Sequence, residues 1–213
     1  MTIEYHLASM LVHVKGGIAM QLLRLALCCL FSHIALSAAA QECAQMPAAK
    51  PGNFVAWTNG LNEQKRREVT SVGKEVTYKD EKGREMRRSV EGNFVADWDF
   101  NRGDPLIYSP HNYFFKFPLC PGDAWGGQYT VKNMATSSQW TSERRAKVGT
   151  QWTDLDLNGK KLRAIEINYT FISNVARLGR IESTCLYSPE IGTNVKCVSN
   201  EPRFAMQVTD WGL

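Results

Sequence analysis

Apolar and polar residues alternate with a period of two along much of the chain. The clearest example is the run I-E-I-N-Y-T-F at residues 165–171, in which every second residue is isoleucine or aromatic. This period is typical of a β-strand with one buried face. After residue 40 no stretch combines a sustained 3.6-residue apolar period with helix caps. The pattern predicts an all-β, single antiparallel domain whose curved sheet closes toward a barrel or a sandwich.

Turn residues divide the chain into short runs of this kind. Gly, Pro, Asn and Asp lie between segments rich in β-branched and aromatic residues. We expect strands at residues 54–57, 69–78, 84–90, 94–100, 113–119, 125–132, 180–187, 194–198 and 204–209. The K-D-E-K-G segment joins the second and third of these strands, and N-R-G-D-P after residue 100 is expected to be a loop.

The stretch D-L-D-L-N-G at residues 154–159 has two interpretations. It begins like a calcium-binding helix–loop–helix site, but position 12 of that loop, which requires glutamate, is Ile165. The other interpretation is a β-hairpin, because Asn-Gly favours the type I′ turn, in which both central residues have positive φ. We therefore predict that Asn158 and Gly159 form a hairpin tip rather than part of a metal site.

This hairpin has a definite register. With the Asn-Gly pair at its tip, Trp152 faces Ile165 and Asp154 faces Arg163. We expect the opposite charges to form ion pairs across the strands. The apolar parity slips between Leu162 and Ile165, which predicts a β-bulge or a change of strand partner there.

The N-terminal 40 residues are typical of an export signal. Residues 20–40 combine one arginine, an apolar run and small residues ending in A-A-A, which predicts the helix of a secretory signal peptide. We interpret residues 1–19 as a mis-called start or an extended leader, and residues 41–213 as one β-rich domain, periplasmic or secreted. Lipidation is disfavoured because Glu42 precedes Cys43, where a lipid-attachment site has a small residue. No later apolar run is long enough to span a bilayer, so no transmembrane segment is expected after signal cleavage.

Four cysteines follow residue 40, and an even number in an exported protein indicates disulfides. Cys185 and Cys197 fall opposite each other if the segment between them forms a hairpin that turns at residues 189–193, and a cross-strand bridge tolerates that spacing. By elimination, Cys43 is expected to pair with Cys120. The four include no C-x-x-C pair, so neither a metal site nor another cofactor is expected.

The charge of the chain is mild. Of its 25 basic and 21 acidic residues, two basic residues and one acid precede residue 41, which leaves 23 against 20, or +3. This balance argues against a nucleic-acid partner. The densest basic stretch, residues 65–88, is interleaved with acids, and we interpret it as a solvated hairpin.

Catalytic chemistry has few candidates. His111 is the single histidine after residue 40, it lies in a Pro-led loop, and no nucleophile motif accompanies it. Asp97 and Asp99 flank Trp98 and so share one face of a strand, an arrangement that would suit a carboxylate-based hydrolase. Ordinary alternation on a solvent-exposed strand gives the same pattern and is the favoured interpretation.

Two segments carry a resemblance. F-P-L-C-P-G-D-A-W (117–125) and L-Y-S-P-E-I-G-T-N-V-K (186–196) are similar to an FPLxxGxxW turn and a YSPExGxxVK hairpin in uncharacterised exported bacterial β-rich proteins, a domain of unknown function. The matching residues are Phe117, Pro118, Leu119, Gly122, Trp125, Tyr187, Ser188, Pro189, Glu190, Gly192, Val195 and Lys196. The resemblance spans residues 114–209 and implies a periplasmic or secreted β-fold, but no catalytic residue.

Physically, both motifs are interpreted as structural. Phe117 and Leu119 share a face, a type II turn centred on Pro-Gly at 121–122 reverses the chain, and Trp125 packs back over them. Tyr187 is expected opposite Val195 as part of the core across the second hairpin.

The sequence favours a disulfide-stabilised envelope protein with a non-catalytic binding or structural role. Its partner is unknown; an apolar envelope ligand held in the concavity of the sheet, or an envelope protein, are the candidates. The alternatives are a hydrolase that uses carboxylates such as Asp97 and Asp99 and a partner of an envelope assembly bound through a sheet edge.

Overall fold

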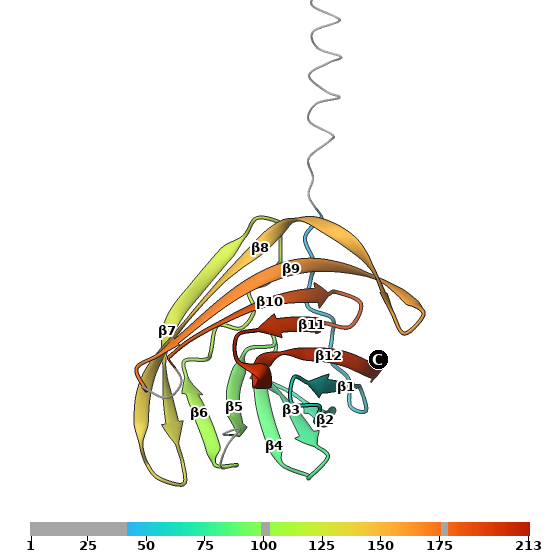
Figure 1. Ribbon diagram of the computed structural model, residues 1–213. Coiled ribbons are helices and arrows are strands. Elements are labelled where there is room, and N and C mark those ends of the chain that lie inside the picture. Colours follow the sequence, from blue (N-terminus) through green and yellow to red (C-terminus); the bar gives the residue numbers. More distant parts are fainter. Residues whose placement is uncertain (1–41, 99–102, 176–178) are drawn as a thin grey trace, which may run out of the picture. The chain divides into compact units, whose positions relative to one another are not determined.

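The computed structural model describes residues 42–98, 103–175 and 179–213, which form an all-β domain (Figure 1). The expected signal peptide and the alternative start lie outside the described residues. Twelve antiparallel strands form one closed barrel in which each strand pairs with its neighbours in sequence and β1 pairs with β12. The fold class predicted from the alternation is confirmed, and of the two expected architectures the barrel is present. No helix in the described part of the chain has the length and hydropathy of a membrane span.

The strands are β1 (Phe54–Asn59), β2 (Gln64–Val72), β3 (Glu75–Asp80), β4 (Glu85–Ser89), β5 (Phe94–Trp98), β6 (Pro105–Ser109), β7 (Ala124–Asn133), β8 (Gln139–Leu157), β9 (Lys160–Ser173), β10 (Arg180–Ser188), β11 (Thr193–Ser199) and β12 (Met206–Gly212). The predicted strands differ from these in several places. The expected strand at 69–78 is two strands, because the chain turns between β2 and β3, where Gly73 N donates to Glu75 O at 2.9 Å. Pro105, the last residue of the expected N-R-G-D-P loop, is the first residue of β6, a strand that was not predicted.

The long β8–β9 hairpin forms the upper part of the barrel wall in the view of Figure 1. Asn158 (φ 55°) and Gly159 (φ 76°) form its tip, and Trp152 pairs with Ile165 as predicted. The register of β8 shifts between Val148 and Trp152, and β10 pairs with β9 only as far as Ile165. This bulge and change of partner explain the slip in apolar parity.

The ion pairs expected across this hairpin are wrong. Asp154 does face Arg163 in the register. The Arg163 guanidinium instead contacts Glu42, with its Nη1 2.6 Å from Oε2, and Glu190, with its Nε 3.7 Å from Oε1. Arg163 therefore pairs with Glu42, which lies in the segment before β1, and with Glu190, rather than with Asp154 across the hairpin.

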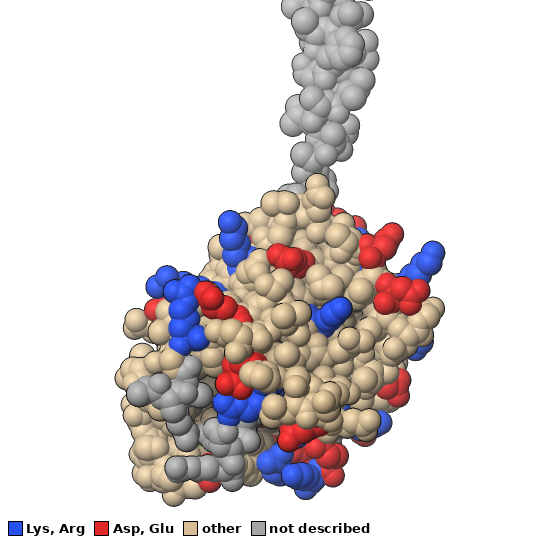
Figure 2. All heavy atoms as spheres, in the orientation of Figure 1, with Lys and Arg blue, Asp and Glu red and all other residues tan. Residues whose placement is uncertain are grey.

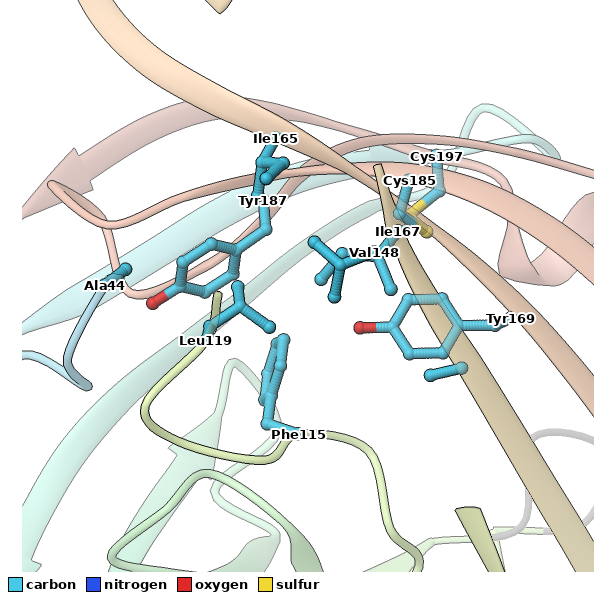
Figure 3. Packing of buried hydrophobic residues seen from close by; sticks show 11 residues of the cluster. Ala44, Phe115, Leu119, Val148, Ile165, Ile167, Tyr169, Cys185, Tyr187 and Cys197 are labelled. Carbon is cyan, nitrogen blue, oxygen red and sulfur yellow. A yellow bond between two sulfur atoms is a disulfide. The ribbon is translucent and has the colours of Figure 1, made fainter. Parts of the chain in front are cut away.

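Residues 113–119 were predicted to form a strand, and they do not. Apart from the bridge between Ala44 and Leu119, they have no strand partner in the described chain. Prolines at positions 110 and 118 lack the N–H that a ladder needs. The segment instead turns Phe115 and Leu119 toward Val148, Ile165 and Tyr187, which Figure 3 shows as one packed cluster.

Both expected disulfides are present. Cys185 and Cys197 are directly opposite on β10 and β11, and Cys43 is bonded to Cys120. Tyr187, however, pairs with Asn194 rather than Val195, because the register of β10 and β11 shifts after Leu186 and leaves Val195 in a bulge. As a result Tyr187 and Val195 belong to different core clusters.

Closure of the barrel changes the prospects for a partner that adds a strand. In the described domain each strand pairs with a strand on both sides. No whole strand therefore offers the free sheet edge that such a partner would need. Unpaired sides remain where a described strand extends past its neighbour: β8 after Lys147 on the side of β7, β9 before Ile165 on the side of β10, and β12 after Gln207 on the side of β11.

Candidate functional site

The inward-facing side chains of the barrel surround a cavity of about 300 Å³. Most of the residues that line it are apolar or aromatic, including Trp57, Leu106, Val131, Phe171 and Ile181 from five different strands. This volume is at the lower end of the range for small-molecule sites. The alternation predicted from the sequence positions these side chains, because every second residue of a barrel strand faces the interior.

The cavity reaches the surface beside the N-terminal segment. Residues 46–49 line it together with the C-terminal Leu213, which is 62% exposed. Pro47 packs against Gly192, where a Cβ would lie 3.1 Å from the proline Cδ. Gly192 also has a φ of 74°, so a side chain there would be strained as well as crowded. This motif glycine therefore allows the segment to approach the cavity mouth.

The barrel interior contains charged side chains that were predicted from the sequence to face solvent. Asp97 is 8% exposed and lines the cavity, with its Oδ2 3.7 Å from Arg67 Nη2. The prediction of an exposed Asp97 is wrong because Val95 is an extra, unpaired residue where β4 meets β5, and this bulge reverses the facing of the residues after it. Asp99, its proposed partner in hydrolysis, lies outside the described residues.

Arg88 faces the same interior. Its guanidinium carbon lies 4.2 Å from the centre of the Phe94 ring and 5.2 Å from that of Tyr78. Its buried Nε has no hydrogen-bond partner in the described structure. Removal from water lowers the pKa of Arg88 to about 10, so it remains charged at neutral pH.

Arg144 is a third interior arginine. It is 8% exposed on β8, and its guanidinium carbon is 4.8 Å from the centre of the Phe114 ring. Its buried Nη1 has no hydrogen-bond partner within the described ranges. The solvated-hairpin interpretation of residues 65–88 therefore holds for Arg66, which pairs with Glu68 at 3.1 Å, but not for Arg67 and Arg88.

Tyrosine hydroxyls complete the polar lining. Burial raises the pKa of Tyr129, and burial together with the nearby Asp97 raises the pKa of Tyr108 well above its ordinary value. Both hydroxyls stay protonated at physiological pH and can donate hydrogen bonds. Asn194, 2% exposed, also lines the cavity, and neither polar atom of its amide has a hydrogen-bond partner among the described residues. The site is thus apolar in bulk, with cations and neutral donors at defined points.

The outer surface contrasts with this interior. On the face shown in Figure 2, basic and acidic side chains lie interspersed. Several of them form ion pairs, such as Lys79 with Glu85 at 3.5 Å and Arg87 with Glu75 at 2.9 Å. Within the described residues, the buried guanidinium donors without a hydrogen-bond partner belong to Arg88 and Arg144 in the interior.

The first motif of the resemblance supports the core beside the cavity. Gly122, with a φ of 84°, lies in a turn in which Asp123 N donates to Cys120 O at 3.1 Å. Trp125 packs on the core cluster, as predicted, and its Nε1 donates to Tyr113 O at 3.1 Å. The ring of Phe117 is 5.9 Å from that of Tyr187, so the structure brings the two motifs together without placing these residues on the cavity wall.

The second motif combines a turn with part of the cavity wall, to which it contributes Gly192 and Asn194. Ser188 Oγ donates to Glu190 Oε2 at 2.7 Å in the turn that includes Pro189, while Lys196 is exposed on β11. His111 lies in its loop, where its Nδ1 accepts a hydrogen bond from Tyr113 N at 3.2 Å.

The sequence interpretation missed the three interior arginines. One available signal was parity, because Arg144 shares the buried face of β8 with serine, alanine and valine at 142, 146 and 148.

Comparisons with known proteins assign no function. No protein-family model and no curated protein matches the chain. The fold is similar to that in the crystal structure of the hypothetical lipoprotein YmcC from Escherichia coli (K12), with a TM-score of 0.48 and 10% sequence identity over 80% of this chain and 90% of that one. The resemblance in the two motifs remains a prediction.

Proposed function

We propose that this protein is an exported, non-catalytic binding protein whose barrel holds an apolar or amphipathic small molecule. The observation that carries this proposal is the interior cavity of about 300 Å³, lined mainly by apolar and aromatic side chains and open beside residues 46–49. Two disulfides support an oxidising compartment such as the periplasm or the cell exterior. Burial of apolar ligand surface would supply the binding energy.

The hydrolase alternative has less support. Glycosidic acid–base chemistry needs a pair of carboxylates on either side of the bond to be cleaved. Asp97 faces Arg67, and Asp97 is the one acid among the described residues that line the cavity. The described lining therefore lacks the second carboxylate that this chemistry needs.

The test enlarges a side chain that lines the cavity and measures the effect on ligand binding. Purified protein, unfolded and refolded with its disulfides intact to remove bound molecules, is titrated with the neutral fluorescent probe 1-N-phenylnaphthylamine. Ile181→Trp places a larger side chain in the cavity and should weaken binding at least about tenfold, since packed interiors do not absorb added volume. Val198→Trp, at a position 66% exposed on the neighbouring strand, is the control and should bind as the wild type does.

Folding of each variant is checked by circular dichroism, and Leu106→Phe provides a second, milder blocking substitution in the same cavity. A wild-type protein that gives no saturable fluorescence increase would contradict the proposal. So would equal binding by the wild type and both blocked variants.

A further inference from the structure

Arg144 is the feature of the cavity that the fold alone does not explain. Its side chain is 8% exposed, and its Nη1 has no hydrogen-bond partner in the part of the chain described. No carboxylate within the described ranges forms a salt bridge with it. Guanidinium groups are rarely left buried in this way, because removing a charge from water is costly unless an opposite charge and hydrogen bonds compensate.

The groups around Arg144 compensate only in part. The ring centres of Phe114 and Phe171 lie 4.8 and 5.8 Å from its guanidinium carbon, so both rings contribute cation–π attraction. Ring faces do not satisfy N–H donors as an oxygen does. The rings of Tyr108 and Tyr129 are 6.0 Å apart, and the positive charge of Arg144 acts electrostatically on both hydroxyls, which are protonated.

The charge of the described cavity lining points in the same direction. Among the described lining residues, Arg67, Arg88 and Arg144 oppose the single carboxylate of Asp97, which leaves +2 from these four groups. Arg203 also lines the cavity, but it is paired with Glu201. The Asp97 carboxylate is engaged by Arg67, so an anion for Arg144 has to come from outside the described chain.

Resting on the ligand cavity proposed above, we propose that the ligand carries an oxyanion, a carboxylate or a phosphate, which binds Arg144 and accepts hydrogen bonds from Tyr108 and Tyr129. The planar guanidinium fork matches both groups in a bidentate geometry. The apolar body of the ligand fills the rest of the cavity between the aromatic and aliphatic side chains.

The experiment compares three ligands that share one chain and differ in their polar end. Refolded full-chain protein is titrated calorimetrically with decanoate, decyl phosphate and decanol at pH 7.4. The wild type should bind at least one of the anions about tenfold or more tightly than decanol, because charge-assisted hydrogen bonds to a buried guanidinium are strong. Decanoate stronger than decyl phosphate identifies a carboxylate ligand, and the reverse order identifies a phosphate.

Arg144→Gln should abolish the preference for the anion and leave decanol binding within about twofold of the wild type, since the apolar contacts are retained. Arg145→Gln is the matched control, because the next side chain is 67% exposed and belongs to the outer face. It should leave all three affinities unchanged. Arg144→Met is the second variant: it should also lose the preference, and the melting temperature of the ligand-free protein should hold or rise, because an uncompensated buried charge has been removed.

The outcomes separate the two proposals. If decanol binds and the anion preference persists in Arg144→Gln or Arg144→Met, the oxyanion site is wrong while the cavity proposal stands. If Arg144→Met strongly destabilises the ligand-free protein and the wild type shows no anion preference, Arg144 is structural and the oxyanion site is again wrong. If none of the three ligands binds and the fluorescent probe also fails, the cavity proposal itself fails.

Discussion

Asp80 shows how one side chain closes a turn in this protein. Its Oδ1 accepts hydrogen bonds from Lys82 N at 2.9 Å and Arg84 N at 2.8 Å, and its Oδ2 contacts the Arg84 guanidinium at 2.7 Å. These contacts hold together the K-D-E-K-G turn between β3 and β4. Burial alone would raise the pKa of Asp80, but the hydrogen bonds outweigh it and keep the pKa below its ordinary value.

A lowered pKa means that the folded protein stabilises the ionised carboxylate. This contribution is present above the unfolded pKa and is lost as the pH falls through the folded one. Asp80→Ala should therefore lower the free energy of unfolding by about 1.5–3 kcal/mol at pH 7, the usual worth of hydrogen bonds to a charged group. The deficit should shrink below about pH 4, near the ordinary pKa of aspartate, in urea unfolding curves.

The exposed Asp154→Asn is the control and should cost less than about 1 kcal/mol at either pH. A deficit for Asp80→Ala that is as large at pH 3 as at pH 7 would contradict the role assigned to the charge.

At the scale of an element, the β8–β9 hairpin depends on its two-residue tip. Asn158 and Gly159 both have positive φ, and the Asn158 Nδ2 donates to Thr209 O at 2.7 Å. Gly159 N donates to Asp156 Oδ1 at 3.0 Å, so one carboxylate that a calcium ion would need is engaged by the turn. The tip thus anchors the hairpin to β12.

Asn158→Ala should destabilise the protein by roughly 1–2 kcal/mol, because alanine resists the left-handed conformation, and should lose the bond to Thr209 in addition. Asn158→Gly is the matched control: it keeps the turn and loses only that bond. Thermal melts of the three proteins measure the difference. Equal melting temperatures for the alanine and glycine variants would show that backbone conformation at the tip does not matter.

The same hairpin separates turn chemistry from metal chemistry. Neither calcium nor EDTA should move the melting temperature by more than about 1 °C, because no ion contributes to the turn. A calcium-dependent rise of several degrees that Asp154→Asn abolishes would restore the metal interpretation.

At the scale of the whole molecule, the barrel is tied to segments that are not strands. Cys43–Cys120 and the bridge between Ala44 and Leu119 join the N-terminal segment to the segment that packs Phe115 into the core. Cys185–Cys197 joins two neighbouring strands. The first disulfide closes a span of 77 residues and the second a span of 12, so they constrain the unfolded chain unequally.

Removing Cys185–Cys197 by a double change to serine should cost about 3 kcal/mol and lower the melting temperature by about 6–12 °C. Removing Cys43–Cys120 in the same way should cost more, about 4–5 kcal/mol, because its loop is longer. Calorimetric melts of the two double variants test the order. If the variant that lacks Cys185–Cys197 melts at the lower temperature, loop length does not govern the effect.

The sequence by itself determined the features that depend on neighbouring residues. Alternation with a period of two predicts strands, and Asn158-Gly159 predicts a tip with positive φ. The spacing of Cys185 and Cys197 predicts a bridge across one hairpin. These properties follow from local backbone geometry, so one stretch of chain contains the information they need.

Only the tertiary structure decided which face of each strand is inside and what that face holds. The bulge at Val95 turns Asp97 inward, and alternation along the sequence does not reveal it. Arg144 lies on the inward face of β8 and lines the cavity that the closed barrel encloses, although a charged residue in a strand ordinarily predicts solvent. Closure and register set the contents of the cavity through pairings between distant strands, and alternation along one strand cannot specify them.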